Sequence, residues 1–379
     1  MQHFQRNPVV DLWADSRGSR AHRLALTGGN SISLLTPSQA ERELLEAVDS
    51  ARNHINVETD AFPCDDLGLR LVDHMAARAH AGVRVNLLHN VAGHGRMAPV
   101  FQRLTGDSVR HSRFRPAGSW LRWITRSHEG RQRPRRMLGV DGRIGFMATG
   151  DTSEAVGWGQ TRFRLEGPIV QRLQREFVAN WQCHSPVTLP TARYFPPLAV
   201  VGTQGVALGP IRATGTLAPC NPWHSALLGA IEAANTSACL ALTRSTLPPR
   251  LLQALLRASS RRVQVRLWVP QQPAADGRRL ERLGWADRLT AAGIEVQRRL
   301  DSLAGSTICV IDQRWSSLGA GQADWRSILD RCETDLIVAD EGFARSLVAE
   351  LTPSNPNAAD GCPNPPRPRG HCKRVEALL

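Results

Sequence analysis

The spacing of apolar residues in the first half of the chain predicts helices and strands in alternation. Residues 37–51 carry leucine and valine on one helical face, and the run 54–59 is strand-like. Helical spacing returns over 67–81 and ends at Gly82, a residue typical of a helix C-terminus. A second strand-like run follows over 83–88. This order predicts an α/β protein whose sheet is mostly parallel and flanked by helices.

The same order of elements returns in the second half, which indicates an internal repeat. Residues 44–51 are echoed without a gap by 227–234, with matched chemistry at most positions. Gly-Val-Asp-Gly-Arg at 139–143 matches Val-Ile-Asp-Gln-Arg at 310–314, where an apolar run meets an aspartate at a turn. A duplicated α/β unit explains both matches. We therefore expect an N-terminal extension (1–30), a first repeat (31–185), a linker (186–218), a second repeat (219–352) and a disordered, proline-rich, basic tail (353–379).

Composition narrows the setting in which the chain works. It has 379 residues with 42% apolar content, and no run of about 18 apolar residues that could span a bilayer. The N-terminus lacks the apolar stretch of a secretory signal, so we expect a cytoplasmic protein, with peripheral contact at the inner membrane face as a further option. The eight cysteines show no metal-binding spacing, and we expect no disulfide framework, metal or other cofactor.

The net charge of +13 favours an anionic partner, which by charge alone could be nucleic acid, an anionic membrane or a phosphate-bearing substrate. Lys373 is the only lysine, and every other basic side chain except the histidines is arginine. We attribute this to codon bias in a GC-rich genome rather than to a selected arginine surface. Whether the scarcity of lysine matters for a mechanism depends on the motifs that the chain carries.

Several stretches carry a resemblance to one family. The first repeat has Val-Glu-Thr at 57–59 and Arg-Leu-Glu-Gly-Pro-Ile-Val at 164–170, and the second has Gly-Ala-Gly-Gln-Ala-Asp-Trp-Arg-Ser at 319–327 followed by Glu333. These segments resemble the phospholipase D superfamily, in particular its cardiolipin synthase branch. The likeness covers nearly all of 31–352 and implies two tandem repeats related by a pseudo-twofold axis.

The chemistry of that family depends on two copies of the motif H-x-K-x4-D, one in each repeat. The resemblance implies that one histidine attacks phosphorus, the other protonates the leaving alcohol, and the lysines neutralise the phosphate oxygens. In this chain the aspartates are Asp141 and Asp312, and the histidine and lysine positions hold Pro134 and Arg136 in the first copy and Gly305 and Thr307 in the second.

Both copies have therefore lost their catalytic pair, which predicts a pseudoenzyme. Asp141 and Asp312 are motif remnants, and in the family this aspartate mainly supports the fold. His128 lies six residues before Pro134 and is the candidate for a displaced catalytic histidine, against the alternative of an exposed loop residue. No other lysine within the two repeats can take the role of the lost motif lysines, since the only lysine, Lys373, belongs to the tail.

Arginine can still hold a phosphate, so Arg135 and Arg136 are candidate phosphate-binding residues in the first repeat. The alternative is a surface arginine pair beside a strand. Four further residues occupy positions that the resemblance assigns to substrate binding: Glu58, Asp151, Gln322 and Glu333.

The segment 114–126 interleaves aromatic residues with arginines just before the first motif. An interfacial membrane contact would place tryptophans at headgroup depth and arginines on anionic phosphates. A buried tryptophan pair is the alternative. The membrane-contact candidates are Trp120, Arg122, Trp123 and Arg126.

These observations favour a phospholipase D-like pseudoenzyme that binds an anionic phospholipid or phosphodiester group. One alternative is an active phosphatidyltransferase that makes cardiolipin from phosphatidylglycerol, through a non-standard site or with an active homologue as partner. Nucleic-acid binding is a third hypothesis, because the chain is basic. No base-stacking motif supports it, and the Glu-Gly-Pro turn at 166–168 argues for the lipid branch.

Overall fold

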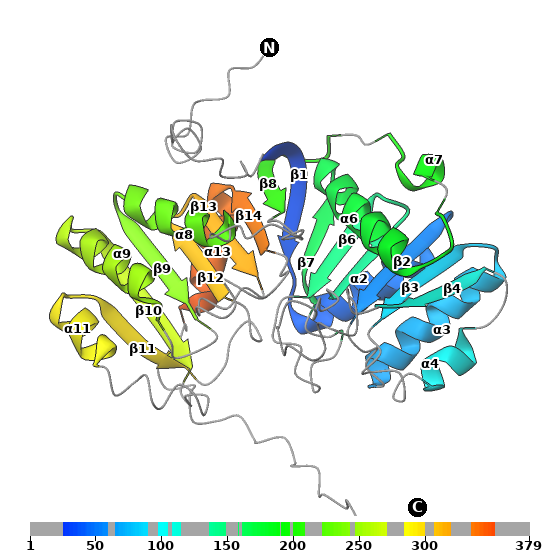
Figure 1. Cartoon of the computed structure of the whole chain (residues 1–379), viewed down its shortest axis with the longest axis horizontal. Coiled ribbons are helices and arrows are strands. Elements are labelled where there is room, and N and C mark those ends of the chain that lie inside the picture. Colours follow the sequence, from blue (N-terminus) through cyan, green and yellow to red (C-terminus); the bar gives the residue numbers. More distant parts are fainter. Residues whose placement is uncertain are drawn as a thin grey trace, which may run out of the picture.

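The computed structural model contains one large mixed sheet with helices on both of its faces (Figure 1). The described strands follow the order β11-β10-β9-β12-β13-β14-β8-β1-β7-β6-β5-β2-β3-β4. The structure describes residues 26–59, 65–89, 98–104, 108–114, 136–148, 158, 161–189, 191–197, 200–208, 222–242, 247–270, 284–299, 307–319 and 335–352.

The first half of the chain builds one lobe. Its elements are β1 (Thr27–Leu34), α2 (Pro37–Asp49), β2 (His54–Thr59), α3 (Asp66–His80), β3 (Arg84–His89), α4 (Ala98–Arg103), β4 (Val109–Arg113), β5 (Arg136–Val140), β6 (Ile144–Ala148), β7 (Thr161–Glu166), α6 (Pro168–His184) and α7 (Thr191–Tyr194). The expected helices at 37–51 and 67–81 and the strand at 54–59 are confirmed to within two residues.

The second half builds the other lobe from the same kinds of element. They are β8 (Gln204–Leu208), α8 (Pro222–Ala233), β9 (Ser237–Ala241), α9 (Pro249–Ser260), β10 (Gln264–Pro270), α11 (Trp285–Ala291), β11 (Glu295–Arg299), β12 (Thr307–Ile311), β13 (Trp315–Gly319), β14 (Asp335–Ala339) and α13 (Glu341–Leu351). The segment 186–218 is more than the connection we expected, because it contains α7 and also β8, which pairs with β14 and β1.

The strand order reads the same from both ends of the sheet, and the two lobes meet where β8 pairs with β1 (Figure 1). The α/β class with two tandem repeats is thus confirmed. The expected mostly parallel sheet needs a correction: β2-β3-β4 and β9-β10-β11 are parallel, whereas the inner described strands pair antiparallel. The cause is the hairpins β5-β6 and β12-β13, which connect neighbours by short turns and leave no crossover helix.

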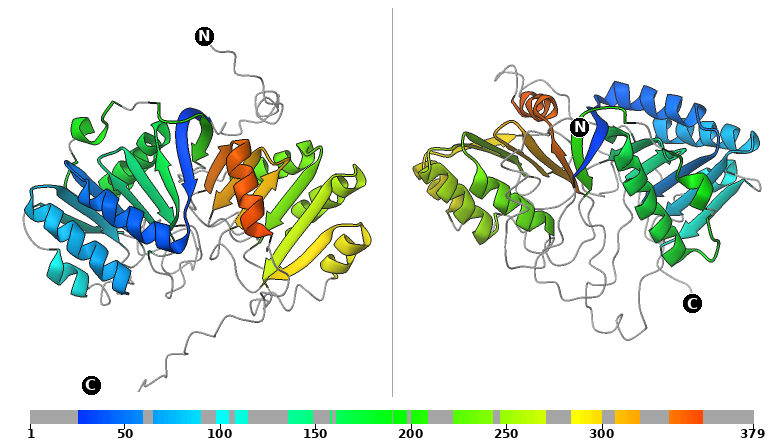
Figure 2. Two further views of the ribbon diagram at one scale, coloured as in Figure 1. Left: turned by 180° about the vertical axis from the view of Figure 1, so that it is seen from behind. Right: turned by 90° about the horizontal axis from the view of Figure 1, so that it is seen from above.

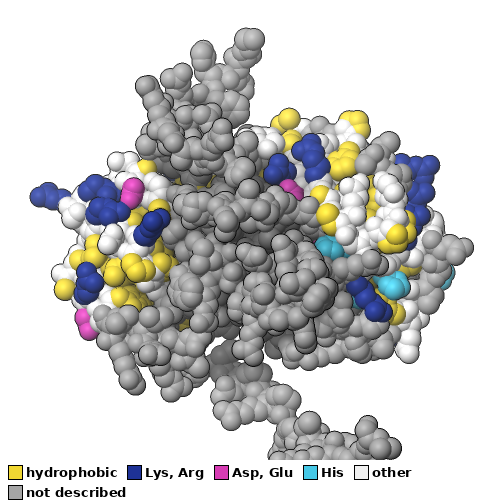
Figure 3. Space-filling model, in the orientation of Figure 1, with side chains coloured by type: hydrophobic (Ala, Val, Ile, Leu, Met, Phe, Trp, Pro, Cys, Tyr) yellow, Lys and Arg dark blue, Asp and Glu magenta, His cyan; other side chains and the backbone are white. Residues whose placement is uncertain are grey.

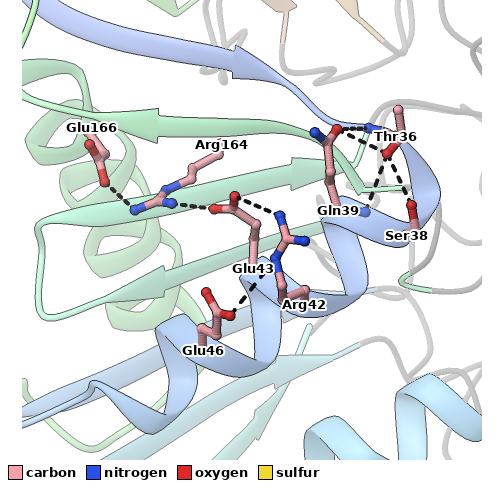
Figure 4. A network of polar contacts seen from close by, with 8 residues as sticks. All are labelled: Thr36, Ser38, Gln39, Arg42, Glu43, Glu46, Arg164 and Glu166. Atoms are coloured by element: carbon pink, nitrogen blue, oxygen red, sulfur yellow. Dashed lines mark hydrogen bonds and ion pairs between the residues drawn. The ribbon is translucent and has the colours of Figure 1, made fainter.

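Helix α2 begins with a capping box. Gln39 donates its backbone N–H to the hydroxyl of Thr36, and Thr36 donates its own N–H to the side chain of Gln39 at 2.9 Å. Along the same helix, Glu43 accepts from Arg164 of β7, and Arg164 also bonds Glu166 (Figure 4). These contacts fasten α2 to the middle of the sheet.

The Glu-Gly-Pro turn ends β7 and starts α6. Gly167 has φ +94, and a Cβ at this position would lie 2.7 Å from the carbonyl oxygen of Gly29. Only glycine fits such a backbone beside such a close neighbour. Asn30 receives the N–H of Ile169 at 2.7 Å and so holds the start of the helix. The residues that carry the family resemblance here thus have a structural role.

Helices cover the sheet differently on its two faces. In the first half α2 and α3 pack on one face, against the core that contains Ile55 and Val57, and α6 packs on the other (Figure 2). In the second half α8 and α9 share one core, and α13 joins α6 in the core at the centre of the molecule. Because successive residues of a strand face opposite sides, β2 directs His54, Asn56 and Glu58 toward α6.

Candidate functional site

The two motif copies fall on equivalent hairpins. Strand β5 starts at Arg136 and runs antiparallel to β2, and β12 starts at Thr307 and runs antiparallel to β9. Each strand then ends at the turn that holds the motif aspartate. The lysine position and the aspartate are therefore about 16 Å apart along the strand. A phosphate bound near the start of these strands lies far from either aspartate.

Asp141 fastens the turn between α2 and β2. Its carboxylate accepts the backbone N–H groups of Arg52, Asn53 and His54, each at 2.8 Å. Asp141 has φ +52, a left-handed conformation that aspartate tolerates better than most residues. The predicted motif remnant is thus a carboxylate with three backbone partners.

Asp312 makes the equivalent contacts in the second half. It accepts the N–H groups of Asn235, Thr236 and Ser237 at 2.8–3.0 Å, and the Thr236 hydroxyl at 2.9 Å. Burial opposes the charged form, but these hydrogen bonds outweigh it and lower the pKa of Asp312. Both aspartates therefore act as structural anchors of the same turn.

The lysine positions differ between the halves. Arg136 is half-buried and pairs in register with Ala148, so a cationic group remains at the start of β5. Thr307 is 1% exposed and pairs with Gly319, so the same place in β12 carries a small neutral side chain. The structure thus retains a cation in only one of the two copies.

Glu58, a predicted substrate-binding residue, lies fully buried under α6. Both of its carboxylate oxygens accept from the side-chain amide of Asn180, at 3.1 and 3.2 Å. A buried carboxylate requires such partners. Its position is that of an internal support close to the end of β2.

Glu58 belongs to a buried polar layer between the sheet and α6 that sequence reasoning did not find. Asn86 donates both to the side-chain oxygen of Asn56 and to the Tyr194 hydroxyl, at 2.7 Å each. Alternation of polar residues at 54, 56 and 58 was the available signal, but it equally suits an exposed strand face. The layer comprises His54, Asn56, Glu58, Asn86, Ser112, Gln174, Asn180 and His184.

The remaining candidate residues lie outside the described part of the chain, and their roles stay predictions. They are the displaced-histidine candidate His128, the phosphate-binding or substrate-binding candidates Arg135, Asp151, Gln322 and Glu333, and the membrane-contact candidates Trp120, Arg122, Trp123 and Arg126. Pro134 and Gly305, at the histidine positions, also fall there.

Within the described ranges, no group of histidine, cysteine and carboxylate side chains is arranged to hold a metal ion. In the same ranges, no helix has the length and apolar character needed to cross a bilayer.

Sequence comparison links the chain to proteins of phospholipid synthesis. A family model described as cardiolipin synthase, PLD-like domain, matches residues 227–352. Cardiolipin synthase 1 of Staphylococcus epidermidis is 26% identical over 336 residues, covering 85% of this chain and 67% of that protein. Cardiolipin synthase A of Pseudomonas aeruginosa is 28% identical over 375 residues, covering 95% of this chain and 73% of that protein.

Comparison of the fold agrees. The crystal structure of a phosphatidylserine synthase from Haemophilus influenzae aligns with a TM-score of 0.60 at 11% identity, over 91% of this chain and 89% of that one. At that identity the likeness concerns the fold alone. With the duplicated sheet and the paired hairpins, these matches support the assignment of the chain to the phospholipase D superfamily. Its sequence is similar to those of cardiolipin synthases.

Proposed function

We propose that this protein is a catalytically impaired phospholipase D-like protein that binds an anionic phospholipid headgroup between its two motif hairpins. The observation that carries the proposal is the unequal pair of residues at the lysine positions. Arg136 keeps a phosphate-binding cation on one side, whereas Thr307 supplies none on the other. Sequence similarity to cardiolipin synthases supports a phospholipid as the ligand.

The loss of catalysis follows from the chemistry that the family needs. Proline at 134 and glycine at 305 offer no nucleophile and no proton, and no lysine occurs outside the C-terminal tail. Arginine binds phosphate bidentately but stays protonated, so Arg136 can hold a headgroup without replacing a histidine. Binding thus survives the changes that remove turnover.

The distribution of charge suits a broad attraction to anionic surfaces. Figure 3 shows arginine side chains spread over both lobes of one face, with few acidic side chains among them. With a net charge of +13, such a surface concentrates the protein near anionic lipid, and peripheral membrane contact forms part of the proposal.

Vesicle sedimentation tests the proposal at the site itself. The protein should sediment with phosphatidylglycerol or cardiolipin vesicles and not with phosphatidylcholine vesicles at moderate salt. Arg136→Gln should weaken binding about fivefold, since one cation near an anionic surface contributes about 1 kcal/mol. Arg143→Gln is the matched control, because Arg143 is an exposed arginine in the turn at the far end of the same hairpin.

Equal binding to neutral and anionic vesicles contradicts the proposal. Equal weakening by Arg136→Gln and Arg143→Gln would leave attraction to the whole surface as the explanation and remove the site. Retained activity through His128 or an active homologue is the competing function. Activity through His128 predicts turnover of phosphatidylglycerol that His128→Ala abolishes, whereas activity through a homologue predicts turnover only when that homologue is present.

A further inference from the structure

A small cavity lies at the first residues of β2 and β3. The motif strand β5 starts near the other end of β2. The volume of the cavity is about 140 Å3, and Arg52, Arg84 and Arg193 contribute to its walls together with His54 and Tyr194. Strands β2 and β3 are parallel, so His54 and Arg84 are register partners at their first residues. The far ends of the two strands are about 17 Å away. The cavity is therefore distinct from the proposed phospholipid site.

The walls of the cavity are held in place by contacts that the motif hairpin makes. The Asp141 carboxylate fixes the backbone of Arg52. The ring of Tyr194 stacks on that of His54, with centroids 4.1 Å apart and planes 16° apart. A Cβ on Gly142 would lie 2.6 Å from the carbonyl oxygen of Tyr194. Helix α7, which ends at Tyr194, therefore rests directly on the turn between β5 and β6.

Three arginines thus converge on one fixed cavity without a countercharge of their own. Within the described residues, Arg52, Arg84 and Arg193 form neither an ion pair nor a side-chain hydrogen bond. Asp141, whose carboxylate binds the backbone of Arg52, is engaged by three backbone N–H groups. Converging guanidinium groups with no partner are the arrangement that binds phosphate bidentately.

His54 lies in the wall of the cavity and is neutral at neutral pH. Its Nε2 lies 3.1 Å from the amide nitrogen of Gln174, which can only donate, so the ring proton resides on Nδ1. Nδ1 is buried and has no partner among the described residues. Burial lowers the pKa of His54 to about 4 despite the nearby Asp141, so at neutral pH the charge of the cavity comes from the arginines alone.

The second half provides an internal comparison. Sheet register places Ser237 and Gln264 where the first half has His54 and Arg84, and Asp312 binds Asn235 where Asp141 binds Arg52. The positions equivalent to Arg52, His54 and Arg84 therefore carry neutral polar side chains, while Arg262 stands where the first half has Gly82. The set of Arg52, Arg84 and Arg193 is a feature of the first half.

We propose that this cavity, formed by Arg52, Arg84 and Arg193 over the stacked rings of His54 and Tyr194, binds a doubly charged phosphate. The phosphate can be inorganic or the terminal group of a phosphomonoester. A cavity of this size is below the usual range of about 300–1,000 Å3 for drug-sized ligands, which suits a single phosphate group. Three cations match a dianion better than the single charge of a phosphodiester.

Calorimetric titration of the full chain tests the site. At constant ionic strength, inorganic phosphate and glycerol phosphate should bind saturably at one site, and dimethyl phosphate, a diester, at least about tenfold more weakly. Arg193→Gln and Arg84→Gln should each weaken phosphate binding about tenfold or more. Arg250→Gln, an exposed arginine at the start of α9, is the matched control and should change binding less than twofold.

Unfolding midpoints without phosphate check that each variant is folded, and exposed Arg193 is the variant least able to disturb the fold. No saturable binding to the wild type overturns the proposal, and so does equal weakening by Arg250→Gln. Equal affinity for dimethyl phosphate overturns the assignment to a dianion. Vesicles that contain phosphatidic acid separate the sources: a loss of binding by Arg193→Gln assigns the phosphate to a lipid, and unchanged binding assigns it to a soluble compound.

Discussion

The two halves of the molecule share one topology but differ in the side chains that they bury at equivalent places. Under α6 the first half pairs two buried asparagines, Asn56 and Asn86, where the second half pairs buried Cys239 with Arg266, whose side chain is 43% exposed and forms an ion pair with Glu295. Glu58, at 0% exposure, has Ala241 as its counterpart, at 8%. The covering helices differ accordingly. Helix α6 has 17 residues and contributes Gln174 and Asn180, whereas α13 has 11 residues and contributes Phe343, Ala344, Leu347 and Leu351.

This difference teaches which parts of the duplicated unit are scaffold. The features kept in both halves are the aspartate anchors, the hairpins and the strand order. Among the described residues, charged and hydrogen-bonding side chains have diverged: Arg136 and Arg84 have Thr307 and Gln264 as their counterparts.

Placing a carboxylate like that of Glu58 at the equivalent position of the second half should have the largest effect on stability. Ala241→Glu buries a charge among apolar residues and should lower the free energy of unfolding by about 4 kcal/mol, measured by urea denaturation. Ala241→Gln has nearly the same volume without the charge and should cost less. A cost below about 1 kcal/mol for Ala241→Glu would show that the second half tolerates a polar layer.

The pH dependence of stability between pH 6.5 and about pH 4 should come mainly from His54 of the first half. The pKa of His54 falls from 6.5 to about 4 on folding, mainly through burial. The unfolded chain binds the proton first, so this contribution is fully present above pH 6.5 and is lost as the pH falls toward 4, by about 3 kcal/mol. His54→Gln should flatten that part of the profile. Exposed His80→Gln is the control, and a flattening of the same size there would refute the assignment.

Removing the charge of either aspartate anchor should lower the free energy of unfolding by less than these changes do. The decrease should be equal in the two halves. Asp141→Asn and Asp312→Asn keep a side chain that tolerates positive φ but lose the charge that three backbone N–H groups share. Each should cost about 2 kcal/mol in unfolding free energy, and the double variant about the sum, because the sites lie in different lobes. Asp73→Asn, on the surface of α3, should stay within about 0.5 kcal/mol. Unequal costs would argue against a shared structural role.

The sequence predicted the outer elements well because their apolar spacing is strong. Helix α2 and strand β2 differ from expectation by at most two residues. Strand direction was not encoded in that spacing, so the inner antiparallel pairing was missed. Helix α7 and strand β8 were hidden by prolines, which are compatible with short ordered segments as well as with linkers.

The buried polar layer and the arginine cavity could not be predicted, since their members are far apart in sequence. Arg52 and Arg193 are 141 positions apart, and nothing local to either residue reveals the other. For Asp141 and Asp312 the family resemblance implied a supporting role, and the structure adds the hydrogen bonds that fit such a role.

Binding without turnover is the central claim, and one assay measures both parts. Purified protein is mixed with phosphatidylglycerol vesicles, and sedimented protein and released glycerol are followed in the same samples, with phosphatidylcholine vesicles in parallel. We predict sedimentation with phosphatidylglycerol only, and glycerol release no higher than in vesicles without protein. Glycerol release above that blank, accompanied by cardiolipin, would contradict the account.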